Sequence, residues 1–225
     1  MSIREKILDI LYPPKCAFCG ALTGDSGGVC AACERALPLR PPGHTLEKAG
    51  QFDCAVALYY DGPVRAGIHA LKFEGASARS RVFARYLAQT AAEELGGQFD
   101  AITFVPVSAR RRFARTYDQA QLLAEECARI WQVKCEKTLR KVRNNPPQST
   151  VRSPAERRAN VLGAYRVRSG ADVAGRRFLL IDDVVTTGST LEACAQELLL
   201  AGASQVVCAA LAGNHRGREK FGKNL

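Results

Sequence analysis

The sequence predicts an α/β domain built around a parallel sheet, preceded by a small N-terminal module that four cysteines hold together. Three observations lead to this prediction. From residue 53 onward, apolar runs of strand length alternate with segments of helix length, which is the pattern of a parallel sheet. Two Cys-x-x-Cys pairs stand near the N-terminus. With 225 residues and 47% hydrophobic content, the chain can form one such domain and a small appendage.

The N-terminal module is expected to span residues 1–45. Its first segment, residues 2–11, has an apolar face at helical spacing and is stopped by Pro13, so we predict a short helix there. The two cysteine pairs follow it. They are Cys16 with Cys19, and Cys30 with Cys33. Residues 37–45 are rich in proline and read as an extended linker.

Two tight Cys-x-x-Cys turns can surround one ion with four thiolates, a tetrahedral set that suits Zn²⁺. Two disulfides or four free thiols are the alternatives, but nine cysteines cannot all pair. Since the protein fills all four positions, the zinc is expected to be structural. The other five cysteines lie in apolar patterns, where we predict buried thiols. They are Cys54, Cys127, Cys135, Cys194 and Cys208.

The larger domain is expected to span residues 46–225. Strands are predicted at 53–60, 100–107, 177–182 and 204–213, and helices at 63–73, 80–95, 117–131 and 190–202. The continuous apolar character of the last three strands is typical of strands that are buried on both faces of a parallel sheet.

The net charge is +10, from 32 Lys and Arg against 22 Asp and Glu. This balance favours phosphates, nucleotides or nucleic acid as partners, although a basic chain without such a partner would have the same composition. No segment approaches the ~18 apolar residues of a membrane span, and the N-terminus lacks the apolar core of a secretory signal. We therefore expect a cytoplasmic protein without membrane insertion.

The most informative stretch is FLLIDDVVTTGST, residues 178–190. Asp182 and Asp183 close a buried strand, and a loop of small residues then leads into a helix. The loop consists of Thr186, Thr187, Gly188, Ser189 and Thr190. Ligands of parallel sheets bind at the carboxyl ends of the strands, and N–H groups at a helix start favour an anion. The loop is suited to a phosphate and the two acids to a vicinal diol, which together describe ribose 5-phosphate.

Other phosphate motifs do not fit this stretch. No lysine follows Gly188, as a P-loop requires, and no Gly-x-Gly-x-x-Gly dinucleotide motif is present. The structural alternative is a helix cap with two spare acids, but two buried acids without a ligand would be costly.

The same stretch resembles the phosphoribosyl pyrophosphate (PRPP) motif of the type I phosphoribosyltransferases. That resemblance implies that Asp182 and Asp183 hold the ribose 2′- and 3′-hydroxyls, that residues 186–190 bind the 5-phosphate, and that Mg²⁺ arrives with the pyrophosphate. Over nearly its full length the chain resembles the ComF family of competence-associated proteins. The matching segments are the Cys₄ module, YDGPVRAGIHALKF, FVPV with its arginines, RKVRNNPPQS, ERRANVLGAYRV and the PRPP motif.

Two places depart from the family pattern. Arg115, Thr116, Tyr117, Asp118 and Gln119 stand where the family usually has Arg-Gly-Phe-Asn-Gln. Asn145 stands where a threonine usually precedes Pro-x-Gln. The added acid at Asp118 argues against carrying an anion contact over to that position.

Basic residues flank the predicted ligand edge. Lys72, Arg110, Arg111, Arg112 and Arg115 are candidate contacts for pyrophosphate or DNA phosphate. A second basic segment runs from Lys137 to Arg158. A solvated basic face is the alternative for each. Phe113 and Tyr117 could stack on bases or pack in the fold.

Two functions stay open. The resemblance implies a protein that binds PRPP or another phosphoribosyl ligand and handles single-stranded DNA during uptake and natural transformation, with a competence helicase as partner. The alternative is an active phosphoribosyltransferase that acts on an amine, ammonia or a base in nucleotide metabolism.

Overall fold

The computed structural model describes residues 13–23, 28–41, 43–73, 78–108, 117–143 and 163–214. The helix predicted at 2–11, the four candidate arginines between 110 and 115, and Asn145 all lie outside these ranges. The helices are α2 (Ala31–Ala36), α3 (Gly62–Phe73), α4 (Arg79–Leu95), α6 (Gln119–Trp131) and α8 (Ser189–Leu200). The strands are β1 (Leu46–Ala49), β2 (Phe52–Tyr59), β3 (Ala101–Phe104), β4 (Lys134–Cys135), β5 (Leu139–Lys141), β6 (Tyr165–Val167), β7 (Arg177–Val185) and β8 (Gln205–Gly213).

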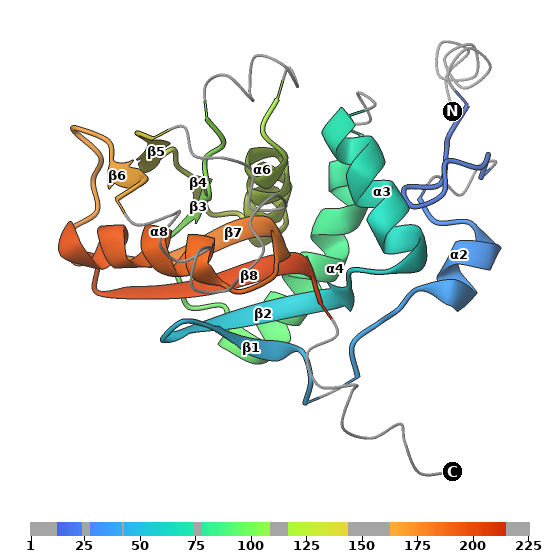
Figure 1. The fold of residues 1–225 in the computed structure, drawn as a ribbon, viewed down its shortest axis with the longest axis horizontal. Coiled ribbons are helices and arrows are strands. Elements are labelled where there is room, and N and C mark those ends of the chain that lie inside the picture. The colour runs from blue at the N-terminus through green and yellow to red at the C-terminus, as the bar shows by residue number, and fades with distance from the viewer. Residues whose placement is uncertain are drawn as a thin grey trace.

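Six strands form one sheet in the order β1-β2-β8-β7-β3-β4 (Figure 1). All neighbours run parallel except β1, which pairs antiparallel with β2. Parallel order brings the carboxyl ends of β2, β8, β7 and β3 to one edge. Strands β5 and β6 form a separate antiparallel hairpin. The predicted α/β class with a parallel sheet is therefore confirmed.

The four predicted strands and four predicted helices are all present in the described residues, with shifted ends. β7 extends to Val185 because it pairs with β8 as far as Val185 and Gly213. Asp182 and Asp183 therefore lie inside the last part of the strand, which extends three residues beyond its predicted end at Asp182. Helix α6 starts two residues later than expected, because the Asp118 side chain accepts hydrogen bonds from Ala120 N and Gln121 N.

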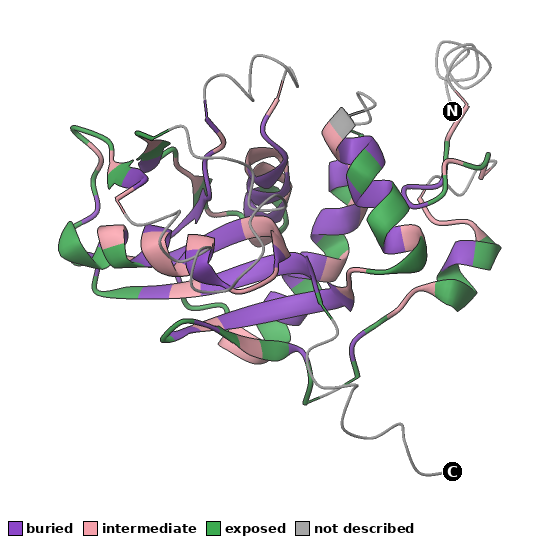
Figure 2. Cartoon of the chain, in the orientation of Figure 1, coloured by how far each residue is buried: buried purple, intermediate pink, exposed green. Residues whose placement is uncertain are grey.

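Helices cover both faces of the sheet, and the central strands are buried (Figure 2). Leu179 and Ile181 of β7 point into the core shared with α3, α4 and α6. Phe178 and Leu180 point into the opposite core, shared with α8. This period of two along β7 explains its continuous apolar run. Cys54, Cys127, Cys194 and Cys208 are buried, as predicted, whereas Cys135 is half-buried.

The N-terminal module packs against the main domain through the first cysteine turn. Phe18 is buried, with its ring centroid 5.2 Å from that of Phe83 on α4. The Arg79 guanidinium, also on α4, donates to the carbonyl oxygens of Cys16 and Ala17. Gly67 of α3 lies so close that a Cβ there would stand 2.8 Å from the Ala17 carbonyl oxygen. The module is thus part of the same packed body.

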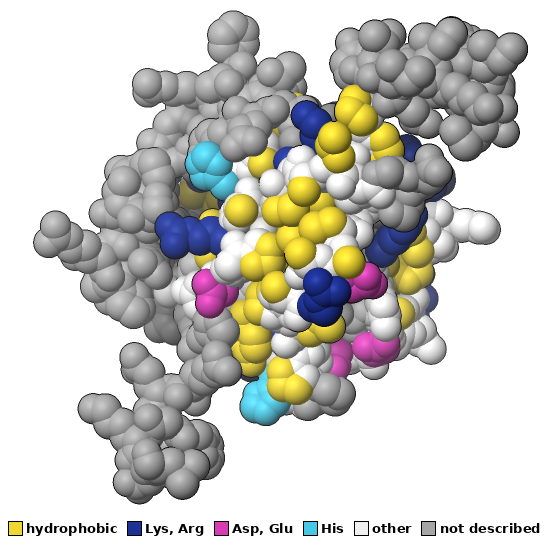
Figure 3. All heavy atoms as spheres, turned by 90° about the vertical axis from the view of Figure 1, so that its right-hand side faces the viewer, with side chains coloured by type: hydrophobic (Ala, Val, Ile, Leu, Met, Phe, Trp, Pro, Cys, Tyr) yellow, Lys and Arg dark blue, Asp and Glu magenta, His cyan; other side chains and the backbone are white. Residues whose placement is uncertain are grey.

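Seen from the side that carries α2 and α3, apolar side chains gather at the centre of the surface, with charges of both signs scattered around them (Figure 3). No helix among the described residues is long and apolar enough to cross a membrane.

Candidate functional site

The two acids of β7 face different surroundings at the carboxyl edge of the sheet. Asp182 lines a small hollow together with Thr186, Gly188 and Ser189. Asp183 instead forms an ion pair with Lys72 at the end of α3. Successive residues of a strand point to opposite faces, and this alternation separates the two carboxylates. A ligand that contacts both acids would have to lie over the edge of β7.

Asp182 favours the neutral, protonated form. Burial raises the pKa of its carboxyl well above the usual range, and the neighbouring Asp183 carboxylate adds to the rise. The N–H of Asp183 donates to Asp182 Oδ1 at 2.8 Å. One acid of the pair is therefore able to donate a hydrogen bond, while the other remains an acceptor beside a cation.

Lys72 was a candidate phosphate contact, and the structure places its ammonium on Asp183. Burial alone would lower the pKa of Lys72, but the Asp183 carboxylate outweighs it and raises that pKa. The Tyr117 hydroxyl donates to the Leu71 carbonyl oxygen at 2.8 Å. This bond ties the end of α3 to the segment before α6. Of the two roles considered for Tyr117, stacking on a base or packing in the fold, the structure therefore shows packing.

The predicted phosphate loop connects β7 to the start of α8. The hydroxyl oxygens of Thr187 and Ser189 lie 2.7 Å apart, and Ser189 N donates to Thr187 Oγ1 at 3.4 Å. The hollow that the loop shares with Asp182 has a volume of about 20 Å³, close to the space that one water molecule needs. Its lining combines hydroxyl groups with the N-terminal turn of a 12-residue helix, the kind of surface that attracts an anion.

Gly188 has a structural role that the sequence did not reveal. Its φ is +78°, in the left-handed region, and a Cβ there would stand 2.6 Å from Ala49 Cα. Ala49 belongs to β1, a strand that the sequence analysis missed, and it is fully buried. The first antiparallel hairpin of the domain therefore supports the loop from behind.

Asp118, the residue at which the chain departs from the family pattern, serves as a buried helix cap. Its Oδ1 accepts from Ala120 N at 3.1 Å and Gln121 N at 3.3 Å, and its Oδ2 accepts from Val107 N at 2.9 Å. Burial raises the pKa of this carboxyl. An asparagine side chain could accept the same cap bond. Asp118 and the asparagine that the family usually has here can therefore both cap α6.

The four cysteines of the N-terminal module come together as predicted. Their sulfur atoms all lie within 4.8 Å of one another, and Cys19 Sγ is 3.6 Å from Cys30 Sγ. Four thiolates at Zn–S distances of about 2.3 Å in tetrahedral geometry have sulfur–sulfur separations of about 3.8 Å. No disulfide joins any of the described cysteines. The arrangement thus fits a structural Zn²⁺ site.

Backbone donors prepare this cluster for a metal. The N–H of Cys30 donates to Cys16 Sγ, and that of Cys33 donates to Cys30 Sγ, each at 3.4 Å. Burial alone would raise the pKa of Cys16, but the N–H donors outweigh it and lower this pKa to about 6. The thiolate, which is the form that binds metals, is thereby favoured.

Two protein families match the chain. Residues 77–223 match the phosphoribosyl transferase domain, and residues 7–43 match the double zinc ribbon domain. The first match contains β7, the loop and α8, and the second contains all four clustered cysteines. The double zinc ribbon match and the Cys₄ geometry together support structural zinc.

Curated relatives match over most of their length. The chain is 32% identical to the DNA utilization protein YhgH of Salmonella typhimurium, over 85% of this chain and 86% of that protein. It is 27% identical to competence protein F of Haemophilus influenzae, over 85% of this chain and 93% of that protein.

Among solved structures, the chain is similar to the glutamine PRPP amidotransferase of B. subtilis, complexed with ADP and GMP. The identity is 27% and the TM-score 0.41, over 60% of this chain and 26% of that chain, so this chain spans about a quarter of the amidotransferase. It is also similar to the adenine phosphoribosyltransferase of Thermoanaerobacter pseudethanolicus, with 16% identity and a TM-score of 0.39 over 63% of this chain and 83% of that one.

Proposed function

Because this chain belongs to the ComF family of proteins with a phosphoribosyl transferase domain and a double zinc ribbon, we propose that it binds PRPP or a related phosphoribosyl ligand at the carboxyl edge of its sheet. Residues 46–225 would form the ligand-binding domain, which has the type I phosphoribosyltransferase fold, and residues 1–45 the zinc module. The relatives named for DNA utilization and competence support a role in handling single-stranded DNA during uptake and natural transformation.

The observation that supports this proposal best is the shared hollow of Asp182 and the loop. One carboxyl group, the loop hydroxyls and the start of α8 line the same small space. In the proposed complex the 5-phosphate contacts Thr186, Thr187, Gly188, Ser189 and Thr190. The ribose lies over the edge of β7, where Asp182 and Asp183 contact its 2′- and 3′-hydroxyls. Mg²⁺, bound with the pyrophosphate, would offset its negative charge.

In this proposal Lys72 orients the Asp183 carboxylate as an acceptor. Its ammonium pairs with Asp183 Oδ2, so the other oxygen can still accept a hydroxyl hydrogen bond. Arg110, Arg111, Arg112 and Arg115 would contact pyrophosphate or DNA phosphate. A competence helicase is the proposed protein partner, and the cytoplasm is the proposed location.

Calorimetric titration of the protein with PRPP, with and without Mg²⁺, tests the ligand. We expect saturable binding that depends on Mg²⁺. If neither PRPP nor ribose 5-phosphate binds, the ligand assignment is wrong.

The alternative function is an active phosphoribosyltransferase that acts on an amine, ammonia or a base. The match of residues 77–223 to the phosphoribosyl transferase domain favours it. Pyrophosphate release from PRPP in the presence of ammonia, amines and free bases distinguishes the two functions. Release that depends on an acceptor would favour the transferase, and binding without release would favour the DNA-handling role.

A further inference from the structure

A second cavity, of about 160 Å³, lies between the carboxyl end of β3, the start of α6 and the β5–β6 hairpin. Its floor includes the buried side chains of Phe104 and Leu139. Four cations line it. They are Lys137, Arg140, Lys141 and Arg168. None of these residues lines the hollow beside the Thr186–Thr190 loop, so the two spaces are separate.

Three of these cations have no acidic partner among the described residues. Lys137, Arg140 and Arg168 are exposed, and none of them forms an ion pair with a residue that the structure describes. The fourth, Lys141, places its Nζ 5.2 Å from the centroid of the Tyr165 ring. An exposed cation without a partner is common, but three around one cavity raise its potential together.

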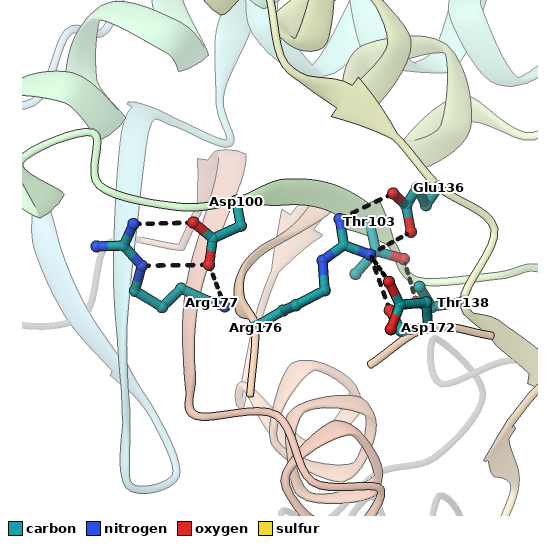
Figure 4. A network of polar contacts seen from close by, with 7 residues as sticks. All are labelled: Asp100, Thr103, Glu136, Thr138, Asp172, Arg176 and Arg177. Carbon is teal, nitrogen blue, oxygen red and sulfur yellow. Dashed lines mark hydrogen bonds and ion pairs between the residues drawn. The ribbon is translucent and has the colours of Figure 1, made fainter. Parts of the chain in front are cut away.

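The nearby acids are engaged elsewhere. Both oxygens of Glu136 accept from Arg176, at 2.9 and 3.0 Å (Figure 4). Asp118 lines the cavity, but its two oxygens accept three backbone N–H bonds. Glu125 accepts from Gln121 Nε2 at 2.6 Å. Among the residues that the structure describes, four cations and one acid, Asp118, line the cavity, so the charge of its lining is net positive.

The backbone that carries the cations is fixed to the main sheet. Thr103 Oγ1 of β3 and Thr138 Oγ1 are buried and lie 2.6 Å apart (Figure 4). Glu136 N donates to the Ile102 carbonyl oxygen, and Arg168 N donates to that of Thr138, each at 2.8 Å. The backbone therefore needs no ordering when an anion binds, and only the side chains lose freedom.

We propose that this cavity is a second anion site, which binds a backbone phosphate of a single-stranded polynucleotide. This inference rests on the DNA-handling part of the proposed function. Guanidinium groups suit phosphate because they offer paired N–H donors. The concave shape favours a flexible single strand, whose phosphate can enter the cavity, over a duplex, whose phosphates lie on a stiff rod.

The test compares two triple variants of the full chain. In the first, Lys137, Arg140 and Arg168 are changed to Gln. In the matched control, Arg35, Arg81 and Arg85, which are exposed on α2 and α4, are changed to Gln, so that both variants lose the same charge. Binding of a labelled single strand is followed by fluorescence anisotropy over a salt series. PRPP binding is measured by calorimetry, and thermal unfolding checks that both variants fold.

We expect the cavity variant to bind the strand at least tenfold more weakly at low salt. Its log–log salt slope should flatten by about 0.7, the contribution of the one phosphate contact that the cavity provides. The control should keep the wild-type slope, and PRPP affinity should stay within twofold in both variants. A wild-type slope in the cavity variant would overturn the inference, and so would an equal loss in the control.

Two further outcomes would also overturn it. If the cavity variant loses PRPP affinity but keeps strand binding, the site belongs to the phosphoribosyl ligand. If a duplex of the same sequence binds as tightly as the strand, the single-strand assignment is wrong. Failure of the wild-type protein to bind any strand would reject the proposed DNA role itself. Strand binding by the wild-type protein that the cavity variant keeps in full would reject the site alone.

Discussion

Lys72 at the end of α3 and Asp183 in β7 form an ion pair across the carboxyl edge of the sheet. The exposed fractions of their side chains are 21% and 13%, so the pair is largely withdrawn from water. The Tyr117 hydroxyl fixes the neighbouring Leu71 carbonyl, and Gly67 of the same helix lies against the first cysteine turn. A single helix thus connects the zinc module to the predicted ligand site.

Changing Lys72 to Gln should weaken ligand binding. Without the ammonium, the Asp183 carboxylate would lack its cationic partner beside an anionic ligand. We expect the affinity for ribose 5-phosphate to fall by about 1.5 kcal/mol or more, roughly tenfold. Lys48→Gln is the matched control, because Lys48 pairs with Asp53 on the exposed surface. Calorimetry that shows equal affinity in wild type and Lys72→Gln would contradict this role.

Asp182 should make stability fall as pH rises. The pKa of its carboxyl in the folded protein lies well above the ordinary 3.8, so between these two values the folded state holds a proton that the unfolded chain releases. Stability from this group is complete below 3.8 and is lost as pH rises through the folded pKa.

Asp182→Asn keeps an acceptor for the Asp183 N–H and removes the titration. We expect its Tm to equal that of wild type near pH 3.8 and to exceed it increasingly toward neutral pH, in the absence of ligand. The pKa of Asp118 is also raised. Because Asp118 is present in both proteins, the difference between their Tm values reports on Asp182 alone. The exposed Asp172→Asn is the control. A Tm difference that does not change with pH would refute the assignment.

Gly188→Ala should destabilise the protein more than its backbone angle alone explains. Gly170 has a φ of +77°, nearly that of Gly188, but nothing lies near its missing Cβ, whereas Gly188 abuts Ala49. Both substitutions introduce left-handed strain of about 1–2 kcal/mol, and Gly188→Ala adds overpacking of about 1–3 kcal/mol. Denaturant unfolding of the two variants measures the difference. An equal loss of unfolding free energy in the two variants would mean that the close approach of Gly188 to β1 adds nothing to the cost.

The zinc module should affect the main domain. Metal analysis of protein purified without added zinc should give about one Zn per chain. Cys30→Ser should lose the metal and also lower the Tm of the main domain, because Phe18, Cys16 and Ala17 contact α4. Phe18→Ala, which spares all four ligands, should keep the zinc and still cost about 3–5 kcal/mol. Metal-free protein with two disulfides would rule out the site.

The sequence was enough to predict the central strands, the cysteine cluster and helices α3, α4, α6 and α8, because their signals are local. Apolar runs mark buried strands, and doubled Cys-x-x-Cys spacing marks a tetrahedral thiolate site. β1 was missed because Leu46–Ala49 is short and half polar, and its pairing with β2 stabilises it. The β5–β6 hairpin was missed because residues 142–164 separate its two short strands in the sequence.

Side-chain partners at the site were also beyond sequence analysis. Asp182 and Asp183 are adjacent, but which one faces the loop and which one meets a cation depends on where α3 ends. The linker at 37–45 gave no sign that Arg40 would be buried, with its guanidinium donating to the carbonyl oxygens of Leu58, His44 and Asn214. These contacts join segments that are distant in the sequence, and neither periodicity nor spacing encodes them.

Discrimination between two sugars tests the central proposal most directly. If Asp182 and Asp183 contact the ribose diol, ribose 5-phosphate should bind more tightly than 2-deoxyribose 5-phosphate in calorimetric titrations, by about 1–3 kcal/mol. Asp183→Asn should reduce that difference, while inorganic phosphate, which contacts the loop alone, binds both proteins alike. Equal affinity of the wild-type protein for the two sugars would contradict the assignment of β7 as the ribose site.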